Sequence, residues 1–308
     1  MHTNKPDLAD ISRSVLRLRA EVPEDAFTTA VLGSQRTGNG IVINDDGLTL
    51  TIGYLITEAK DVWLTAVGGR EVAGHALAYD HVTGFGLVLP LEKPDVPPIP
   101  LGSSSQLLAG DEAFVLSYPE FAKPHTVSVV GRREFAGAWE YLLEGAIFAA
   151  PAHPHWSGAA LVDSGGTLVG LGSLLVREVI GGEDLNANMF VPIDLLIPIL
   201  HDLRTKGQAA RRSRPWLGIY SVEAADKVYV TAVADGGPGQ IADVHEGDMI
   251  IQVGEHEISG LSDFYRHVWA MGSAGVAIPL TLIRGGTLLR VAVRSIDRND
   301  LLKRPQAH

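Results

Sequence analysis

The sequence offers serine and histidine side chains, but no cysteine, for covalent chemistry. The lack of cysteine excludes thiolate catalysis, structural disulfides and cysteine zinc sites. Ser157 lies close to His153 and His155 in the chain, and a serine hydroxyl is a good nucleophile only when an adjacent base accepts its proton. The spacing of His75 and His81 matches no compact metal motif such as His-Glu-x-x-His. We therefore expect no metal ion and no cofactor.

Composition and charge narrow the class of protein. The chain of 308 residues is 46% hydrophobic and 20% charged, which is ordinary for a folded protein of about two domains. The net charge of −11 is carried by residues 1–210, with 14 basic and 25 acidic side chains, whereas 211–308 are neutral overall. Nucleic acid and anionic membranes are not attracted to an acidic surface. We therefore expect no nucleic-acid partner and a solvated acidic surface.

The N-terminal residues bear on the location of the protein. The first ten residues lack the apolar run of a signal peptide. No stretch approaches the roughly 18 apolar residues of a membrane-spanning helix. We expect no membrane insertion and, for the chain as written, a cytoplasmic location. A periplasmic location is expected instead if an upstream segment is missing.

Short strand candidates with turn residues between them follow one another along the first two thirds of the chain. They cover residues 14–19, 41–43, 48–50, 62–67, 71–79, 85–89, 113–117, 126–130, 141–148 and 168–175. The turn Asn44-Asp45-Asp46-Gly47 is typical of a β-hairpin. No convincing amphipathic helix appears between Phe27 and Met189. The pattern predicts a mostly β region, either a β-sandwich or a pair of β-barrels.

The composition changes near residue 194. Residues 194–203 are predicted to form a short apolar-faced helix that closes a first domain at 1–203. The polar and basic residues 204–214 are typical of a linker. A second domain is expected at 215–298, with strands near 217–221, 228–233, 249–253, 277–283 and 288–293 and a helix near 261–270. Leu261, Phe264 and Val268 would form the core-facing stripe of that helix.

The order of these pieces, together with four local strings, resembles the HtrA/Deg family, in which a trypsin-like double β-barrel precedes a PDZ domain. The strings are Thr37-Gly38-Asn39-Gly40-Ile41-Val42-Ile43 with Asp46-Gly47, Ala160-Leu161-Val162-Asp163 with Gly166-Thr167-Leu168-Val169-Gly170, Pro215-Trp216-Leu217-Gly218-Ile219, and Glu246-Gly247-Asp248-Met249-Ile250-Ile251. Each string is weak alone, but four in the right order at the right spacing are specific. The resemblance covers nearly the whole chain and implies the double β-barrel at 1–203 and the PDZ domain at 215–298.

The resemblance also identifies the catalytic positions. The family's chemistry needs a serine nucleophile, a histidine base and an aspartate that orients the histidine. Ser157 remains at the nucleophile position. Tyr54 stands at the histidine position and Gly84 at the aspartate position. His155 occupies the position of a glycine whose backbone N–H helps to form the oxyanion hole.

These replacements predict a pseudoprotease. A tyrosine hydroxyl with a pKa near ~10 stays protonated at neutral pH and cannot accept the proton of Ser157. Loss of the base alone costs on the order of 10⁶ in kcat in a model serine protease, and loss of one oxyanion donor costs roughly 10²–10³. Tyr54 is then a packing residue that plugs the old cleft, and the protein acts as a peptide-binding or scaffolding module.

Two alternatives remain open. The protein could be an active serine endopeptidase of protein quality control, with His153 or His155 as a displaced base. It could also be a regulatory subunit that assembles with active paralogues. The resemblance further implies a homo-oligomer, since relatives are commonly trimers.

The PDZ resemblance predicts a peptide site in the second domain. PDZ domains add a C-terminal peptide to a sheet edge, and backbone N–H groups hold its carboxylate. The corresponding turn here is Leu217-Gly218-Ile219, preceded by Trp216, and Arg214 is placed to attract the carboxylate. We therefore expect the C-termini of proteins or peptides as partners. In the alternative interpretation this domain only packs against the first and its groove is covered.

Overall fold

The computed structural model describes residues 7–118, 124–180 and 182–303. The chain forms two compact units. The first consists of residues 1–133, 145–210 and 302–308, and the second of residues 134–144 and 211–301. Residues 134–144, which the sequence pattern places in the first domain, thus cluster with the second. The first six residues, on which the expected lack of a signal peptide partly depends, lie outside the described residues.

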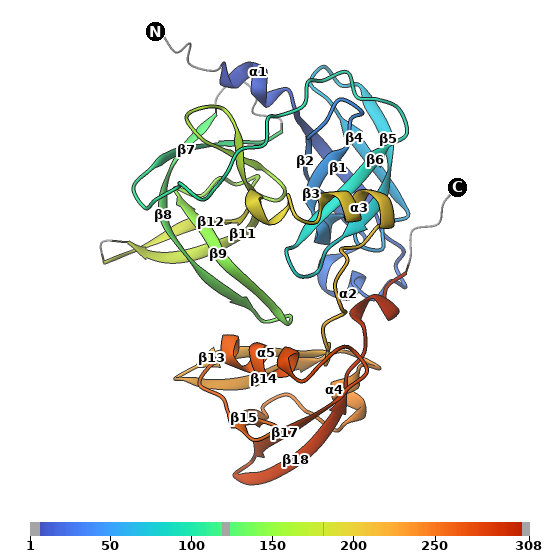
Figure 1. Cartoon of the computed structure of the whole chain (residues 1–308), viewed down its shortest axis with the longest axis vertical. Helices are drawn as coiled ribbons and strands as arrows, with labels where there is room; N and C mark the ends of the chain where they lie inside the picture. Colours follow the sequence, from blue (N-terminus) through green and yellow to red (C-terminus); the bar gives the residue numbers. More distant parts are fainter. Residues whose placement is uncertain (1–6, 119–123, 181, 304–308) are drawn as a thin grey trace. The chain divides into compact units, whose positions relative to one another are not determined.

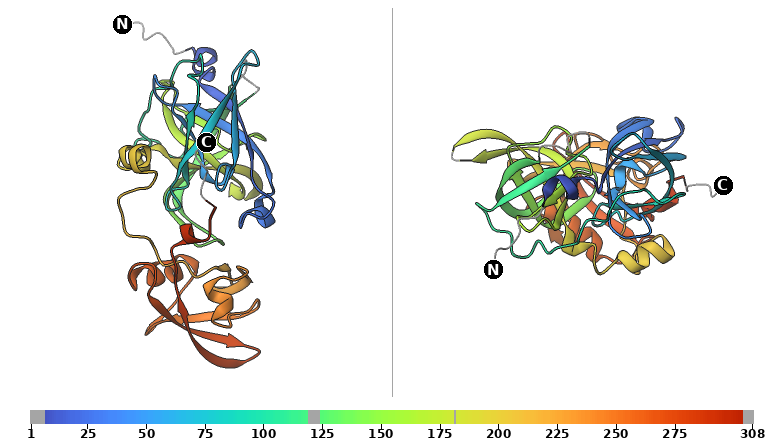
Figure 2. Two further views of the ribbon diagram at one scale, coloured as in Figure 1. Left: turned by 90° about the vertical axis from the view of Figure 1, so that its right-hand side faces the viewer. Right: turned by 90° about the horizontal axis from the view of Figure 1, so that it is seen from above.

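The first unit contains two closed β-barrels side by side, one coloured blue to cyan and the other green to yellow (Figure 1 and Figure 2, right). The first barrel has the order β1-β2-β3-β6-β5-β4, with β1 (Val15–Glu21), β2 (Gln35–Val42), β3 (Thr49–Ile52), β4 (Asp61–Thr65), β5 (Glu71–Tyr79) and β6 (Phe85–Pro90). The second has the order β10-β11-β12-β9-β8-β7, with β7 (Glu112–Leu116), β8 (His125–Gly137), β9 (Tyr141–Ala150), β10 (Ala160–Val162), β11 (Leu168–Ile180) and β12 (Glu183–Pro192). The predicted pair of barrels is confirmed.

The local sequence explains the turn that joins β2 and β3 in the first barrel. Asn44 Oδ1 accepts hydrogen bonds from the backbone N–H groups of Asp46 and Leu48, so the side chain closes the turn between β2 and β3. β3 then pairs with β2 and with β6, and all four of its residues are buried. This strand leads directly into the short 3₁₀ helix η1 (Gly53–Leu55), which carries Tyr54.

The helices of the first unit are short, and one prediction needs correction. α1 (Leu8–Ser12) and α2 (Thr29–Leu32) precede β1 and β2. The predicted helix at 194–203 is instead η2 (Ile193–Leu195) followed by α3 (Leu200–Lys206). Pro198 explains the break, because it has no N–H to donate to the preceding turn. α3 continues beyond residue 203 into the stretch predicted as linker.

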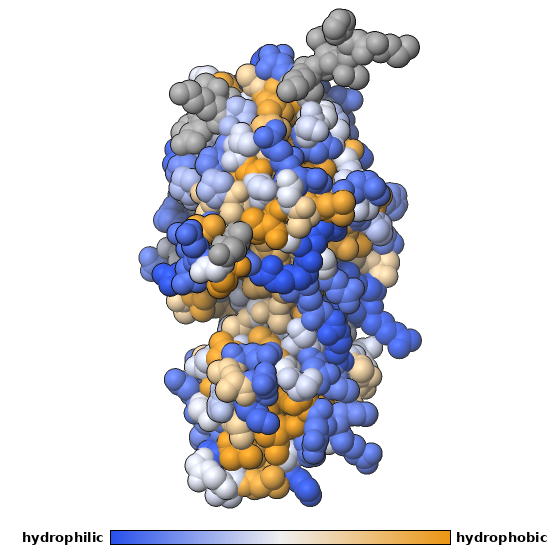
Figure 3. Space-filling view, turned by 90° about the vertical axis from the view of Figure 1, so that its left-hand side faces the viewer, coloured by the Kyte–Doolittle hydropathy of each residue, from blue (hydrophilic) through white to orange (hydrophobic). Residues whose placement is uncertain are grey.

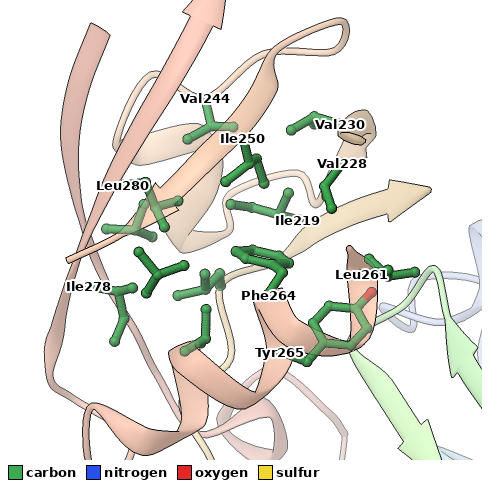
Figure 4. Close-up of a cluster of buried hydrophobic side chains, with 14 of the residues drawn as sticks. Ile219, Val228, Val230, Val244, Ile250, Leu261, Phe264, Tyr265, Ile278 and Leu280 are labelled. Atoms are coloured by element: carbon green, nitrogen blue, oxygen red, sulfur yellow. The ribbon is translucent and has the colours of Figure 1, made fainter. Parts of the chain in front are cut away.

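The second unit is a six-stranded sheet, in the order β13-β14-β15-β17-β18 with β16 paired to β15. Its elements are β13 (Ile219–Ala224), β14 (Lys227–Val233), α4 (Pro238–Ile241), β15 (Met249–Val253), β16 (His256–Glu257), α5 (Leu261–Ala270), β17 (Ala277–Arg284), β18 (Thr287–Arg294) and η3 (Arg298–Asp300). α5 buries the predicted stripe of Leu261, Phe264 and Val268, and adds Tyr265. Figure 4 shows Tyr265 at the margin of this core rather than at its centre.

The surface carries scattered apolar side chains. Val31, Val179 and Ile241 are each more than 70% exposed, but they lie on separate elements. Hydrophobic and hydrophilic side chains are interspersed on the face drawn in Figure 3. None of the helices in the described part of the chain is long and apolar enough to cross a membrane.

One ion pair connects two strands inside the second unit. The carboxylate of Asp248, which is 0% exposed, accepts hydrogen bonds from Nε and Nη2 of Arg284 at 2.7 and 2.8 Å and from the N–H of His245. Asp248 precedes β15 and Arg284 ends β17, so the bidentate pair fixes the ends of neighbouring strands. Such planar pairs combine charge with defined geometry.

We expect Asp248→Ala to lower the free energy of unfolding of the second unit by about 1–3 kcal/mol, because it removes the buried acceptor of three hydrogen bonds, two of them from Arg284. Denaturant titration followed by hydrogen exchange in peptides from 211–301 measures this change. Asp243→Ala is the matched control: this carboxylate also contacts Arg284, but its side chain is 75% exposed. Equal losses in the two variants would contradict the assignment.

Candidate functional site

The first candidate site is the pair formed by Tyr54 and Ser157. The two hydroxyl oxygens are 2.8 Å apart, and the Tyr54 hydroxyl also donates to the backbone carbonyl of Ser173 at 2.9 Å. A phenol has one proton. Because that proton is directed to Ser173, the Ser157 hydroxyl must donate to the phenol oxygen. The fold thus brings Tyr54 to the place from which a base would serve Ser157.

The phenol cannot act as that base. Loss of water around the Tyr54 side chain raises its pKa well above the usual value, although the hydrogen bond with Ser157 acts in the opposite direction. At neutral pH the group is therefore a neutral phenol. Its oxygen can accept a hydrogen bond from Ser157, but it cannot take the proton away.

The third member of a triad is missing from the turn before β6. Gly84 has φ 90°, and its carbonyl accepts the N–H of Gly53 at 2.8 Å. The carboxylate of Asp80, in the same turn, accepts hydrogen bonds from the N–H and the hydroxyl of Thr83. Gly84 contributes no side chain, and its positive φ disfavours any residue with a Cβ.

In the turn before Ser157, the N–H of His155 is hydrogen-bonded within the turn. The backbone N–H of His155 donates to Nδ1 of His153 at 3.0 Å, so it is not free to stabilise an oxyanion. The buried ring of His153 places Nε2 3.4 Å from the hydroxyl of Ser117. Both ring nitrogens of His153 therefore have partners other than Ser157, while His155 is exposed.

Asn39 joins the two barrels at this site and was not predicted as a site residue. Its Nδ2 donates to the carbonyls of His155 and Ser157, each at 2.9 Å, and its Oδ1 accepts the N–H of Tyr118 at 2.8 Å. Asn39 is 2% exposed. It stands in the string Thr37-Gly38-Asn39-Gly40, which was used for the family resemblance but not as a site.

A cleft of about 630 Å³ lies beside Ser157. Its lining includes Tyr54, Asn39 and the turn at 154–157. The guanidinium of Arg36 supports one wall, because it donates to the carbonyls of Tyr54 and Thr57 and to the hydroxyl of Thr28. The cleft is large enough to hold a few peptide residues even though the triad is incomplete.

The second candidate site is the predicted carboxylate turn of the second unit, and a carboxylate already lies there. Glu140 accepts hydrogen bonds from the N–H of Leu217 at 3.0 and 3.1 Å and from the N–H of Ile219 at 3.1 Å. The N–H of Gly218 interacts with the same carboxylate. The N–H groups of this turn therefore donate to a carboxylate of the chain itself, which belongs to Glu140 at the tip of the β8–β9 hairpin.

The neighbouring residues of this tip also contact β13 and α5. The N–H of Ser221 on β13 donates to the carbonyl of Ala138 at 3.0 Å. The hydroxyl of Tyr265 on α5 donates to the carbonyl of Gly137 at 2.7 Å and accepts the N–H of Glu140 at 3.3 Å. Leu142, 8% exposed, packs in the core of the second unit.

The other predicted peptide-binding residues have different surroundings. The guanidinium of Arg214 lies 4.1 Å from the centre of the Trp269 ring, whereas the cation that lowers the pKa of Glu140 is Arg298. Trp216 is buried. Gly218 has φ 67°, and a Cβ there would lie 3.0 Å from the Trp216 ring, so glycine is required by the turn itself. Arg298, Tyr265 and Glu140 were not predicted, because no local pattern connects them.

The surroundings shift the titration of Glu140. Loss of water raises the pKa of its carboxyl to about 7, although the amides of Leu217, Ile219 and Gly218 and the charge of Arg298 act in the opposite direction. Tyr220 and Tyr265 also face this carboxylate. A free glutamic acid has a pKa of about 4.3. A raised pKa means that the docked arrangement binds a proton more readily than the free side chain.

We expect the stabilising effect of docked Glu140 to be present in full below pH ~4.3 and to decline as the pH rises through about 7. The difference in free energy of unfolding between the natural chain and Glu140→Ala should therefore be larger at pH 5 than at pH 8, by about 2–3 kcal/mol. Denaturant titrations at the two pH values measure it. A difference that is the same at both, or larger at pH 8, would contradict this sign.

Residues 38–171 match the model of a trypsin-like peptidase domain, and residues 215–294 match the model of a PDZ domain. The first match contains Ser157, Tyr54 and Gly84, and the second contains the carboxylate turn at 217–219.

Several curated proteins are similar to this chain. A probable periplasmic serine endoprotease, DegP-like, from Hahella chejuensis is 24% identical over 84% of this chain and 57% of that protein. Protease Do-like 1, chloroplastic, from Arabidopsis thaliana is 26% identical over 96% of this chain and 71% of that protein. The chain spans only 57% and 54% of the DegP-like proteins of Hahella chejuensis and Pseudomonas fluorescens. The periplasmic names of these relatives leave the expected cytoplasmic location unconfirmed.

Solved structures share the fold. The HtrA-type protease AlgW with decapeptide has a TM-score of 0.55 and 19% identity, covering 98% of this chain and 100% of that one. A serine endoprotease from Yersinia pestis has a TM-score of 0.53 and 19% identity, covering 96% and 99% of the two chains. At this identity the likeness establishes the fold alone.

Proposed function

This chain belongs to the HtrA/Deg-type family of trypsin-like serine proteases with a PDZ domain, and we propose that it is a proteolytically inactive member that binds peptide C-termini. The observation that carries the first part is the hydrogen bond between the Tyr54 and Ser157 hydroxyls. It puts a neutral phenol where the chemistry needs a base. The relatives are named as proteases, so the proposal of inactivity rests on the residues of this chain and not on the comparisons.

Three independent features support inactivity. Tyr54 cannot take the proton of Ser157. Gly84 brings no carboxylate that could orient a replacement base. The N–H of His155, which would be one oxyanion donor, is bound to His153. Each feature alone would slow catalysis by orders of magnitude, and a rescue by His153 is disfavoured because both of its ring nitrogens already have partners.

The second part of the proposal rests on the carboxylate turn. The N–H groups of Leu217 and Ile219 converge on a carboxylate at 3.0–3.1 Å, which is the arrangement by which PDZ domains hold a peptide C-terminus. An HtrA-type protease of the same fold has been solved with a decapeptide. Scaffolding of other proteins, as a homo-oligomer or together with active paralogues, would follow from such capture.

We expect no hydrolysis of unfolded casein above the level of the Ser157→Ala control and no labelling of Ser157 by a fluorophosphonate probe. The probe reacts only with a serine whose proton is removed by a base, and Tyr54 provides none. Casein cleavage is followed by fluorescence, and labelling by intact-protein mass spectrometry. Labelling or cleavage that disappears in Ser157→Ala would establish the alternative, an active endopeptidase with an unexpected base.

We also expect the full chain to bind a fluorescein-labelled decapeptide ending in Val-Leu through its free carboxylate. The same peptide with an amidated C-terminus should bind at least about tenfold more weakly, because hydrogen bonds to a charged group contribute roughly 1.5–3 kcal/mol. Fluorescence anisotropy measures both affinities. Equal affinities would show that the carboxylate turn is not the site.

A further inference from the structure

We propose that residues 136–142, the tip of the β8–β9 hairpin, are an internal ligand of the PDZ domain, and that a C-terminal peptide binds only by displacing them. The proposal rests on the peptide-binding function proposed above. It concerns contacts within the second unit alone, since residues 134–144 and 211–301 belong together.

The tip supplies the carboxylate that a peptide would supply. Both oxygens of Glu140 accept the N–H of Leu217, and Oε1 also accepts the N–H of Ile219. Each backbone N–H donates one hydrogen. A peptide carboxylate cannot receive these hydrogens while Glu140 holds them, so the two ligands exclude one another.

The tip also supplies the strand contact and the apolar side chain. Peptides join a PDZ domain along its exposed edge strand and insert an apolar side chain into the domain. Here the carbonyl of Ala138 accepts the N–H of Ser221 on β13, and Leu142 packs among the core residues, which include Leu217, Ile219 and Val268. One short segment therefore provides all three elements of peptide recognition, although the carboxylate and the apolar group come from different residues.

Further contacts hold the tip in place. The Tyr265 hydroxyl bonds the backbone on both sides of the turn, at Gly137 and Glu140. Nη1 of Arg298 donates to the carbonyl of Trp139 at 3.3 Å. Arg266 pairs with Glu134 at the base of the tip. These groups come from α5 and from the segment after β18, so the tip is held from both sides.

The fit is imperfect in ways that allow displacement. Glu140 has φ 57°, a conformation that is unfavourable for a residue with a side chain. Its carboxylate loses water on docking, which raises its pKa. The hydroxyl of Ser221, buried on β13, has no hydrogen-bond partner among the described residues. A peptide that ends in a free carboxylate and an apolar side chain avoids the strain, and it is the class of ligand we expect to compete.

The proposal is tested first without any peptide, in the full chain at pH 7. Glu140→Ala removes the carboxylate and leaves the backbone strain unchanged. Its matched control is Glu144→Ala, in the same segment, whose side chain is 83% exposed and lies 3.9 Å from Arg266. We expect faster hydrogen–deuterium exchange in the segment 215–221 of Glu140→Ala and natural exchange in Glu144→Ala. Equal exchange in all three proteins would overturn the internal ligand.

The second test measures competition with the labelled Val-Leu decapeptide. Because an occupied groove lowers the apparent affinity by the fraction of molecules that are open, Glu140→Ala should bind at least about tenfold more tightly than the natural chain. Tyr265→Phe, which removes only the hydroxyl, should shift the affinity in the same direction. Glu144→Ala should leave it unchanged. Equal affinity in the natural chain and in folded Glu140→Ala would overturn the competition.

The two tests separate this inference from the proposed function. If exchange at 215–221 rises in Glu140→Ala but no variant binds the free-acid peptide, the tip is docked as a structural element and both peptide binding and competition are rejected. If all variants bind the peptide equally and prefer it to the amidated form, the peptide function stands and the internal ligand is rejected. Circular dichroism of each variant verifies that the fold is intact.

Discussion

The side-chain amide of Asn39 links the two barrels at the point where chemistry would occur. It donates to the carbonyls of His155 and Ser157 from one barrel while its own strand, β2, belongs to the other. The carbonyl of Ser157 also accepts the backbone N–H of Asn39 at 2.9 Å, so the backbone and the side chain of Asn39 act together at this junction. The amide thereby helps to hold Ser157 within hydrogen-bonding distance of Tyr54. The hydroxyl pair of Tyr54 and Ser157 and the cleft beside it lie at this junction of the two barrels.

Two polar groups in the molecule have opposite consequences for function. At Tyr54 the surroundings favour the neutral phenol, and the hydrogen bonds to Ser157 and Ser173 use it as a structural connector. At Glu140 the surroundings oppose the charge, yet three backbone N–H groups and Arg298 compensate for it in part. The first arrangement leaves no group that can move a proton. The second leaves the Glu140 carboxylate hydrogen-bonded in a contact that, as we propose, a peptide can displace.

Local pattern placed most of the strands but left a β-sandwich or a pair of β-barrels open, and the family resemblance supplied the double barrel and the PDZ domain. Strands such as β5 and β15 and the helix α5 appear where apolar periodicity and turn residues place them. β12 was not predicted, because its first four residues, Glu183 to Asn186, are exposed and mostly polar, and they form a strand by pairing with β11. The helix near 194–203 is interrupted for a reason that is local, the proline at 198. Of the catalytic positions, Tyr54 and Ser157 are brought together, while Gly84 lies in a turn that offers only its carbonyl.

The sequence by itself determined which chemical groups are present: a serine without histidine or aspartate at the family's positions, and a glycine turn suited to a carboxylate. Those facts depend on residue identity, which folding does not alter. Only the tertiary structure decided which groups meet. It directed the single proton of Tyr54 to Ser173, and it placed Glu140 in the turn at 217–219, 77 positions from Leu217 along the chain. Such contacts join segments far apart in sequence, and their partners are set by strand pairing and packing, which no local pattern contains.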